Sequence, residues 1–309
     1  MVFLLFKFAV KDFIDDREFK NLSPKTVEGY KLCLQKFQEF LTDEEIVDVG
    51  EVTAGVVKRY LLDLKNNRNN NPTSLNTKLK NLKAFFNYLV QEEIIEEKGN
   101  PTKKVEYVKE DIKIEVFTDS QIKQMLTYFQ RTMTRDKTFF AYRDYAIIVT
   151  LLGTGMRLGE ICNLQWRHVD FENLAMTTYG KKREYSSLPI NDKLKKELRE
   201  FKIYQIKCLG KETEYVFTNQ TGGRLTENAL QNVFKRLKTI MNFKGVRVSA
   251  HTFRHTFAHR CLMAGMDVFT LQRMLRHSKI DMTQRYLALW GTALKEQNDK
   301  FNPLNNLNI

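Results

Sequence analysis

Apolar residues recur every three or four positions through most of the first hundred residues, which places them on one face of a helix. One such stripe follows Ser23-Pro24, a helix N-cap followed by proline at the first helical position. A second begins after Thr53 and ends at the polar run 66–72, and a third covers about 74–97. The pattern predicts an all-helical N-terminal domain over residues 1–99.

The chain opens with an apolar run at residues 1–6 that Lys7 and Lys11 interrupt. This run is too short to span a bilayer and carries no signal-peptide cleavage pattern, so we expect a first helix there. No later stretch has the length and apolar character of a transmembrane helix. We therefore expect no membrane association.

The rest of the chain mixes helical stripes with short β patterns. Residues 100–116 are charged and lack a long periodic pattern, which indicates a linker. Thr118-Asp119-Ser120-Gln121 resembles a capping box that opens a second domain over 117–290, followed by a tail over 291–309. Further expected elements are helices over 143–153, 226–240, 251–264, 267–276 and 282–290, and strands over 174–179, 185–188 and 215–217. The expected fold class is mainly α with a small β-sheet.

The chain carries a large and unevenly distributed positive charge. The formal net charge is +13 and the isoelectric point about 9.4, which favours a polyanionic partner. Residues 1–99 carry 15 basic against 16 acidic side chains, so the excess lies in residues 100–309. Within the first domain, the charged residues of 53–90 are nevertheless all basic apart from Asp63, so this stretch is a candidate surface for facing DNA. Their basic side chains are Lys58, Arg59, Lys65, Arg68, Lys78, Lys80 and Lys83. An ordinary solvated face is the alternative, and charge alone does not choose between the two.

The cysteines and histidines do not predict a metal site. Cys33, Cys162, Cys208 and Cys261 form no CxxC pair, so neither a zinc site nor a disulfide framework is expected, and a reducing cytoplasm fits. The histidine pair at 255 and 259 has the i,i+4 spacing of metal ligands but lacks the HExxH pattern. We expect no metal and no cofactor.

Tyr286 stands at the end of an ordered series of basic groups. His277 precedes it by nine residues, Arg254 by 32, and Arg157 lies further upstream. Cations around a tyrosine suit an attack on a phosphodiester, because the transition state gains negative charge on its non-bridging oxygens. Arginine suits this role best, since its planar fork can grip phosphate through two hydrogen bonds.

Four stretches of the chain, in their order along the sequence, resemble the sequence boxes of the tyrosine recombinase (phage integrase) family. The length of the chain is similar to that of the family's Xer-type members. Residues 154–161 (TGMRLGEI) resemble the first arginine box, and 251–258 (HTFRHTFA) the His-x-x-Arg box. Residues 275–278 with Tyr286 resemble the box of the last histidine and the nucleophile, and 23–30 the opening of the core-binding domain. The resemblance implies a SAM-like helical DNA-binding domain followed by an α+β catalytic domain.

The resemblance also implies site roles. Tyr286 would attack phosphorus and form a covalent 3′-phosphotyrosyl link, which preserves the bond energy so that rejoining needs no cofactor. Arg157 and Arg254 would clamp the phosphate, with Glu160 supporting them. His251 and His277 would hydrogen-bond the phosphate or move the tyrosine proton. The alternatives are purely structural roles: Tyr286 would be a half-buried helical tyrosine, and Arg157 would form an ion pair with Glu160 at i,i+3.

Three further positions belong to this comparison. Lys181 resembles the β-hairpin lysine that would protonate the departing 5′-oxygen, with Lys182 and Arg183 as adjacent alternatives or DNA contacts. His255 matches its box without a catalytic role, and we expect it to be a core or supporting histidine. Arg276 stands where the family usually has glycine, so it could alter the turn or contact phosphate.

We therefore expect a site-specific recombinase that acts through a Holliday junction as a homotetramer on double-stranded DNA and is a monomer or weak oligomer when free. Accessory DNA-bending proteins and a place at the nucleoid, in a bacterium or on a phage or other mobile element, fit this reading. The tail 291–309 would dock on a neighbouring protomer, or else fold back on its own domain. The alternatives are a type IB topoisomerase and a non-catalytic DNA-binding regulator.

Overall fold

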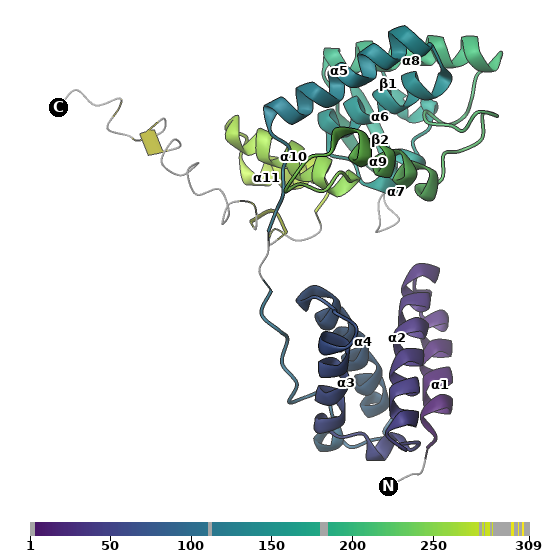
Figure 1. Cartoon of the computed structure of the whole chain (residues 1–309), viewed down its shortest axis with the longest axis vertical. Coiled ribbons are helices and arrows are strands. Elements are labelled where there is room, and N and C mark those ends of the chain that lie inside the picture. The colour runs from purple at the N-terminus through teal and green to yellow at the C-terminus, as the bar shows by residue number, and fades with distance from the viewer. Residues whose placement is uncertain are drawn as a thin grey trace. The chain divides into compact units, whose positions relative to one another are not determined.

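The computed structural model describes residues 4–110, 113–179 and 185–277, together with positions 280, 282–284, 286, 298–299, 302 and 305. The chain divides into two compact units, residues 1–112 and 113–309 (Figure 1). The predicted lysines of the hairpin and most of the predicted tail lie outside the described residues. No helix in the described ranges is long and apolar enough to cross a membrane.

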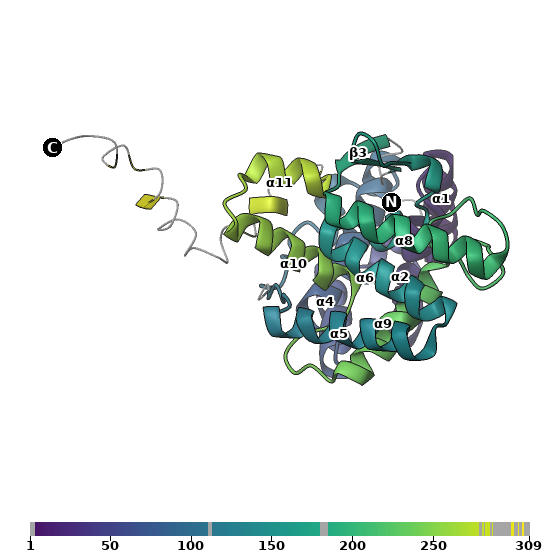
Figure 2. The same ribbon diagram turned by 90° about the horizontal axis from the view of Figure 1, so that it is seen from above.

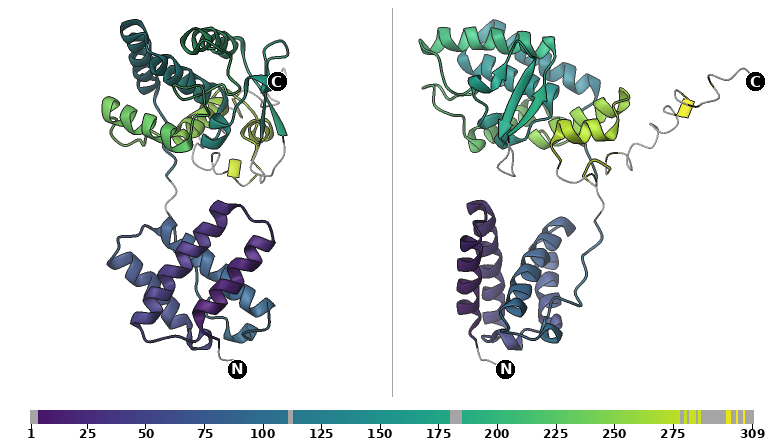
Figure 3. Two further views of the ribbon diagram at one scale, coloured as in Figure 1. Left: turned by 90° about the vertical axis from the view of Figure 1, so that its right-hand side faces the viewer. Right: turned by 180° about the vertical axis from the view of Figure 1, so that it is seen from behind.

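The described residues of the first unit form four α-helices, as the apolar stripes predict. These are α1 (Phe6–Phe19), α2 (Pro24–Asp43), α3 (Ala54–Asn66) and α4 (Pro72–Gln91). Side chains of Ser23, Thr53 and Asn71 cap the last three by accepting a hydrogen bond from the main chain of the first turn. α1 packs on α2 and α4, and α3 packs on α4 (Figure 3). Their shared core is aromatic and includes Phe13 and Phe37.

The third predicted helix ends earlier than expected, at Gln91 rather than about residue 97. Glu93 has φ 57°, and the N–H of Ile94 bonds back to the carbonyl of Leu89. This reversal turns Ile94 and Ile95 onto the core of the unit instead of continuing the helix.

Part of the segment predicted as the linker forms hydrogen bonds with α4 of the first unit. The amide of Asn76 on α4 donates to the carbonyl of Val108 and accepts from its N–H, both at 2.8 Å. Glu110 accepts hydrogen bonds from Thr73 and Asn76 at 2.8 and 2.6 Å. Residues up to 110 therefore follow α4 of the first unit. In the second unit, the N–H of Phe117 donates to Thr256.

The second unit is helical with one small sheet (Figures 1 and 2). Its helices are α5 (Asp119–Asp136), α6 (Phe139–Thr154), α7 (Leu158–Cys162), α8 (Asp192–Leu209), α9 (Glu227–Met241), α10 (Ala250–Met263) and α11 (Val268–Leu275). Thr118 and Gln121 form the predicted capping box of α5. The apolar helix α6 is buried and packs against α5, α8 and α10.

The sheet has three antiparallel strands in the order β1 (Val169–Asp170), β2 (Ala175–Tyr179) and β3 (Tyr185–Pro189). β2 and β3 match the predicted hairpin strands, and Tyr179 pairs with Tyr185 at one end of their register. The strand expected over 215–217 is wrong. Tyr215 and Thr218 make only isolated β-bridges. The apolar side chains of Val216 and Phe217, which suggested a strand, are instead buried in the core of the unit.

Candidate active site

The first arginine box forms a tight turn between α6 and α7. Gly155 ends α6 with φ 59°, and a Cβ there would lie 2.6 Å from the ring of Phe257. Both conditions favour glycine, which has no side chain and tolerates positive φ. Arg157 follows as the N-cap of α7, with its side chain about one-third exposed. The turn thus lies against α10 and α11, and it places the Arg157 guanidinium group next to the end of α11.

Glu160 lies between two arginines of this site. Its Oε1 is 2.8 Å from Nη1 of Arg157, and its Oε2 accepts from the main-chain N–H of Arg157 at 2.9 Å. The same Oε2 lies 2.6 Å from Nη2 of Arg276. Burial alone would raise the pKa of Glu160, but the charges of Arg276 and Arg157 and the hydrogen bonds from Arg157 bring it below its ordinary value. Glu160 is therefore an ionised carboxylate that holds both cations in place.

Arg254 is buried on α10 and bonds to main-chain carbonyls of two separate segments. Its Nη1 donates to the carbonyl of Gly155 at 2.7 Å, and its Nη2 donates to the carbonyl of Leu275. Arg157 similarly donates to the carbonyl of Arg276 at 3.1 Å. The two guanidinium groups therefore tie the glycine turn to the end of α11.

The end of α11 sets the position of His277. Arg276 has φ 55° and ψ 46°, and the N–H of His277 bonds back to the carbonyl of Gln272 at 3.1 Å. This is the left-handed ending that usually takes glycine. The side chain of Arg276 is buried against Glu160 instead of facing solvent, so this structure lends no support to the predicted phosphate contact.

Tyr286 lies among histidines from two segments. His255 Nδ1 is 2.7 Å from the phenol oxygen of Tyr286, and the ring of His251 contacts that of His255 at 4.9 Å between centroids. The ring of His277 is nearly parallel to that of Tyr286, at 6.4 Å, and its Nδ1 lies 2.8 Å from Oγ1 of Thr283. The predicted tyrosine and histidines therefore gather at one place in the second unit.

Burial and neighbouring cations set the protonation of these groups. Burial, then His251 and Arg254, lowers the pKa of His255 to about 4, and burial, then Arg254 and Arg157, lowers the pKa of His277 to about 3. Burial raises the pKa of Tyr286, while Arg254 and Arg157 oppose that rise. At neutral pH these two histidines are thus neutral and the phenol keeps its proton.

Other predicted site residues lie elsewhere. Lys181, Lys182 and Arg183 fall outside the described residues. In the first unit Lys58 and Lys80 are exposed, whereas Arg59 pairs with Glu44, Lys83 lies over the ring of Tyr107 and Lys78 is half-buried. No group of three potential metal ligands occurs within the described part of the chain.

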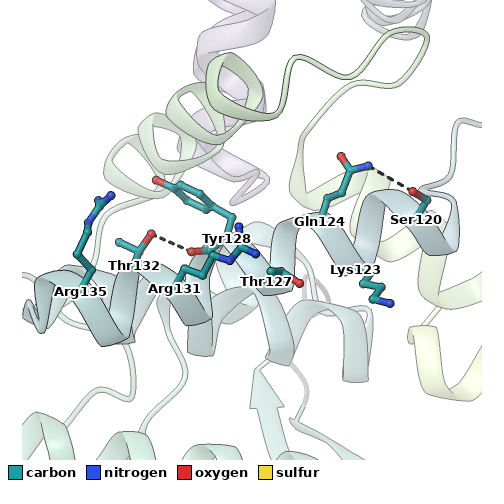
Figure 4. A pocket seen from close by; sticks show the side chains of 8 residues that line it. All are labelled: Ser120, Lys123, Gln124, Thr127, Tyr128, Arg131, Thr132 and Arg135. Atoms are coloured by element: carbon teal, nitrogen blue, oxygen red, sulfur yellow. Dashed lines mark hydrogen bonds between the residues drawn. The ribbon is translucent and has the colours of Figure 1, made fainter.

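Two site neighbours were not predicted from the sequence, namely the contact of His255 with Tyr286 and that of Thr283 with His277. A signal for the first was present, since His255 follows His251 by four positions and so shares its helix face. A separate groove runs along α5 (Figure 4). Its lining residues are Ser120, Lys123, Gln124, Thr127, Tyr128, Arg131, Thr132 and Arg135, which include none of the predicted catalytic groups.

Comparison with known proteins assigns the class. Residues 115–290 match the phage integrase family, and residues 10–96 match the phage integrase N-terminal SAM-like domain. The first match covers more than half of the sequence, so the chain belongs to the phage integrase family.

Similar proteins agree with this assignment. A tyrosine recombinase XerC of Anoxybacillus flavithermus is 29% identical over 274 residues, which cover 86% of this chain and 88% of that protein. The XerC of Oceanobacillus iheyensis is 28% identical over 293 residues, covering 94% and 93%. A structure of the Tn1549 transposon integrase in complex with transposon right end DNA has a TM-score of 0.74 at 21% identity, covering 96% of this chain and 99% of the other. At that identity the likeness describes the fold.

Proposed function

We propose that this chain is a site-specific DNA recombinase that cleaves and rejoins DNA through a covalent 3′-phosphotyrosyl intermediate. The observation that carries the proposal is the position of Tyr286, which lies beside His255 and His277 in a member of the phage integrase family. Arg157 and Arg254 influence the same phenol electrostatically. Relatives named tyrosine recombinase XerC support the same activity.

In the proposed reaction, the phenol oxygen of Tyr286 attacks the scissile phosphorus and the 5′-oxygen departs. Arg157 and Arg254 stabilise the negative charge on the non-bridging oxygens, which ordered donors do best because they need no reorganisation. His251 and His277 donate further hydrogen bonds, and Lys181 protonates the departing oxygen. The phosphotyrosyl link conserves the energy of the broken bond, so no cofactor enters the reaction.

Double-stranded DNA is the proposed partner of both units. The basic excess of residues 100–309 and the basic stretch 53–90 favour binding to the phosphate backbone. In that first-unit stretch the exposed Lys58 and Lys80 are the best placed for such contacts, whereas Arg59 is already paired with an acid. Binding from both units would hold one duplex between two basic surfaces.

Assembly is the finer part of the proposal. Four protomers would act on two sites through a Holliday junction, with the tail 291–309 docking on a neighbouring protomer, and each protomer would be a monomer or weak oligomer when free. The apolar residues of this tail support docking, since such a segment is stable only when covered. Accessory DNA-bending proteins and a site of action on nucleoid DNA in the cytoplasm complete the proposal.

A plasmid assay separates recombination from topoisomerase activity. Two plasmids, carrying one or two copies of the duplex that the protein selects from a random library, are incubated with the protein. A recombinase inverts or excises the segment between paired sites, whereas a type IB topoisomerase relaxes the single-site plasmid as readily as the other. Relaxation without exchange would overturn the proposal, and a protein that binds without changing either plasmid would be a regulator.

A further inference from the structure

We propose that His255 is a further catalytic residue, which accepts the phenol proton of Tyr286 while the phenol oxygen attacks phosphorus. This inference rests on the proposed function and deepens it. The family resemblance implies proton handling by His251 or His277, and it gives His255 no role. The structure instead brings His255 into direct contact with the reacting oxygen.

Geometry is the first support. His255 Nδ1 lies 2.7 Å from the phenol oxygen, within the range that proton transfer between heavy atoms requires. The two rings meet edge to face, at 5.5 Å between centroids and 67° between planes. Phe253, Thr256 and Phe257 are buried beside His255 on α10, so the helix that carries the imidazole is fixed in the core.

Burial is the second support. Tyr286 is only 3% exposed, so bulk water has little access to its phenol proton. A neutral imidazole carries one ring lone pair, and in the tautomer with hydrogen on Nε2 that lone pair lies on Nδ1. Nδ1 then faces the phenol O–H as an acceptor. His255 therefore provides a proton acceptor at a position that bulk water reaches poorly.

The other histidines are engaged differently. His277 Nδ1 is close to Oγ1 of Thr283, at 2.8 Å, and the His277 ring is nearly parallel to that of Tyr286. His251 contacts the ring of His255. His251 and His277 therefore remain suited to phosphate oxygens, while His255 is suited to the nucleophile.

Bound phosphate would favour the transfer. Burial, then His251 and Arg254, keeps the pKa of His255 low in the free protein, and an anionic phosphate near the Arg254 cation offsets its effect. As the bond from the phenol oxygen to phosphorus forms, the O–H bond breaks and its proton moves to Nδ1. The bond from phosphorus to the 5′-oxygen breaks in the same step, and that oxygen takes a proton from Lys181 in the proposed reaction. During rejoining, His255 returns its proton to the phenol oxygen.

The first test needs no substitution. Nitrogen NMR of the native protein labelled at histidine reports which ring nitrogen of His255 carries hydrogen. We expect hydrogen on Nε2 and an unprotonated Nδ1 at neutral pH. Hydrogen on Nδ1 would overturn the proposal, because that nitrogen could not accept the phenol proton.

The second test measures covalent adduct formation in single turnover, on a nicked duplex of the selected site. His255→Asn keeps a polar atom near the position of Nδ1 but cannot take a proton, so the rate should fall by about 100-fold or more while DNA affinity is retained. His259→Asn, one turn further along α10, is the matched control and should react at close to the native rate. A His255→Asn variant as fast as this control would overturn the proposal.

A sulfur-substituted substrate identifies the proton concerned. Replacing the scissile 5′-oxygen by sulfur gives a leaving group that needs no proton, so the defect of His255→Asn should persist on that substrate. Recovery of the native rate would assign His255 to the leaving group and overturn the proposal. If the native protein forms no adduct on either substrate, the proposed function itself fails, which separates the two outcomes.

Discussion

Oε2 of Glu160 lies 2.6 Å from Nη2 of Arg276, and this ion pair joins the start of α7 to the end of α11. Both side chains are almost fully buried. Arg276 stands where the family resemblance leads us to expect glycine, and its backbone has the left-handed conformation that suits glycine. The guanidinium group therefore offsets a backbone cost by pairing with the carboxylate that also holds Arg157.

Replacing Arg276 should separate these two effects. Arg276→Ala loses the ion pair and keeps the strained backbone, whereas Arg276→Gly loses the pair but relieves the strain. We expect the glycine variant to exceed the alanine variant by about 1 kcal/mol in free energy of unfolding, measured in urea. Equal stabilities of the two variants would contradict the left-handed conformation at this position.

Glu160 should make stability depend on pH. Its pKa is lowered in the folded protein, so its contribution is present above its unfolded pKa of about 4.3 and is lost as pH falls through the folded value. Glu160→Gln should cost about 3 kcal/mol at pH 7, because the buried Arg276 and the partly exposed Arg157 lose their counter-charge. The gap between variant and native protein should shrink as the pH is lowered below that unfolded value.

Tryptophan fluorescence during urea unfolding suits this measurement, since Trp166 and Trp290 both belong to the second unit. The exposed Glu172 offers a control in Glu172→Gln. A stability gap for Glu160→Gln that stays constant between pH 7 and acid would show that the carboxylate is not held ionised by the arginines.

If Arg157 and Arg254 clamp the scissile phosphate as proposed, replacing them should slow cleavage and leave DNA binding intact. Arg254→Lys keeps the charge but loses the fork, and Arg157→Ala removes a donor, so each should slow adduct formation by about 100-fold. Arg135→Ala, which changes an exposed arginine paired with its neighbour, is the control and should react normally. A clamp variant that forms adduct as fast as the control would reassign that arginine to structure.

Removing the tail 291–309 should impair assembly on DNA. A chain cut after Gly291 should bind a single site nearly as well as the full chain, because the proposed DNA contacts precede the cut. It should fail to pair two sites and to recombine them, as followed by native gels of two-site complexes. Normal pairing and exchange by the shortened chain would mean that the tail only covers its own unit.

The sequence contained most of the helices because their caps are local. Ser23, Thr53 and Thr118 each start a helix by a hydrogen bond within four residues, which a pattern of residue types can reveal. α8 was missed although Asn191 caps it and Leu194, Leu198 and Phe201 line its buried face. Its mostly charged residues conceal this apolar stripe.

The site was only partly readable for a different reason. The family boxes identified Arg157, Arg254 and Tyr286. That these residues lie close together was predicted from the family resemblance and not from their spacing in the sequence. The contact between His255 and Tyr286 spans 31 positions, so it depends on tertiary packing and not on a local pattern. The Arg276–Glu160 pair spans 116 positions, so no local pattern could reveal it.

The most direct test of the account is covalent capture of DNA by Tyr286. Native protein and Tyr286→Phe are incubated with the nicked duplex of the selected site, and the products are separated on a denaturing gel. The account predicts a protein–DNA adduct for the native protein, and for Tyr286→Phe an unchanged DNA affinity with no adduct. An adduct formed by Tyr286→Phe would contradict the assignment of the nucleophile and the mechanism built on it.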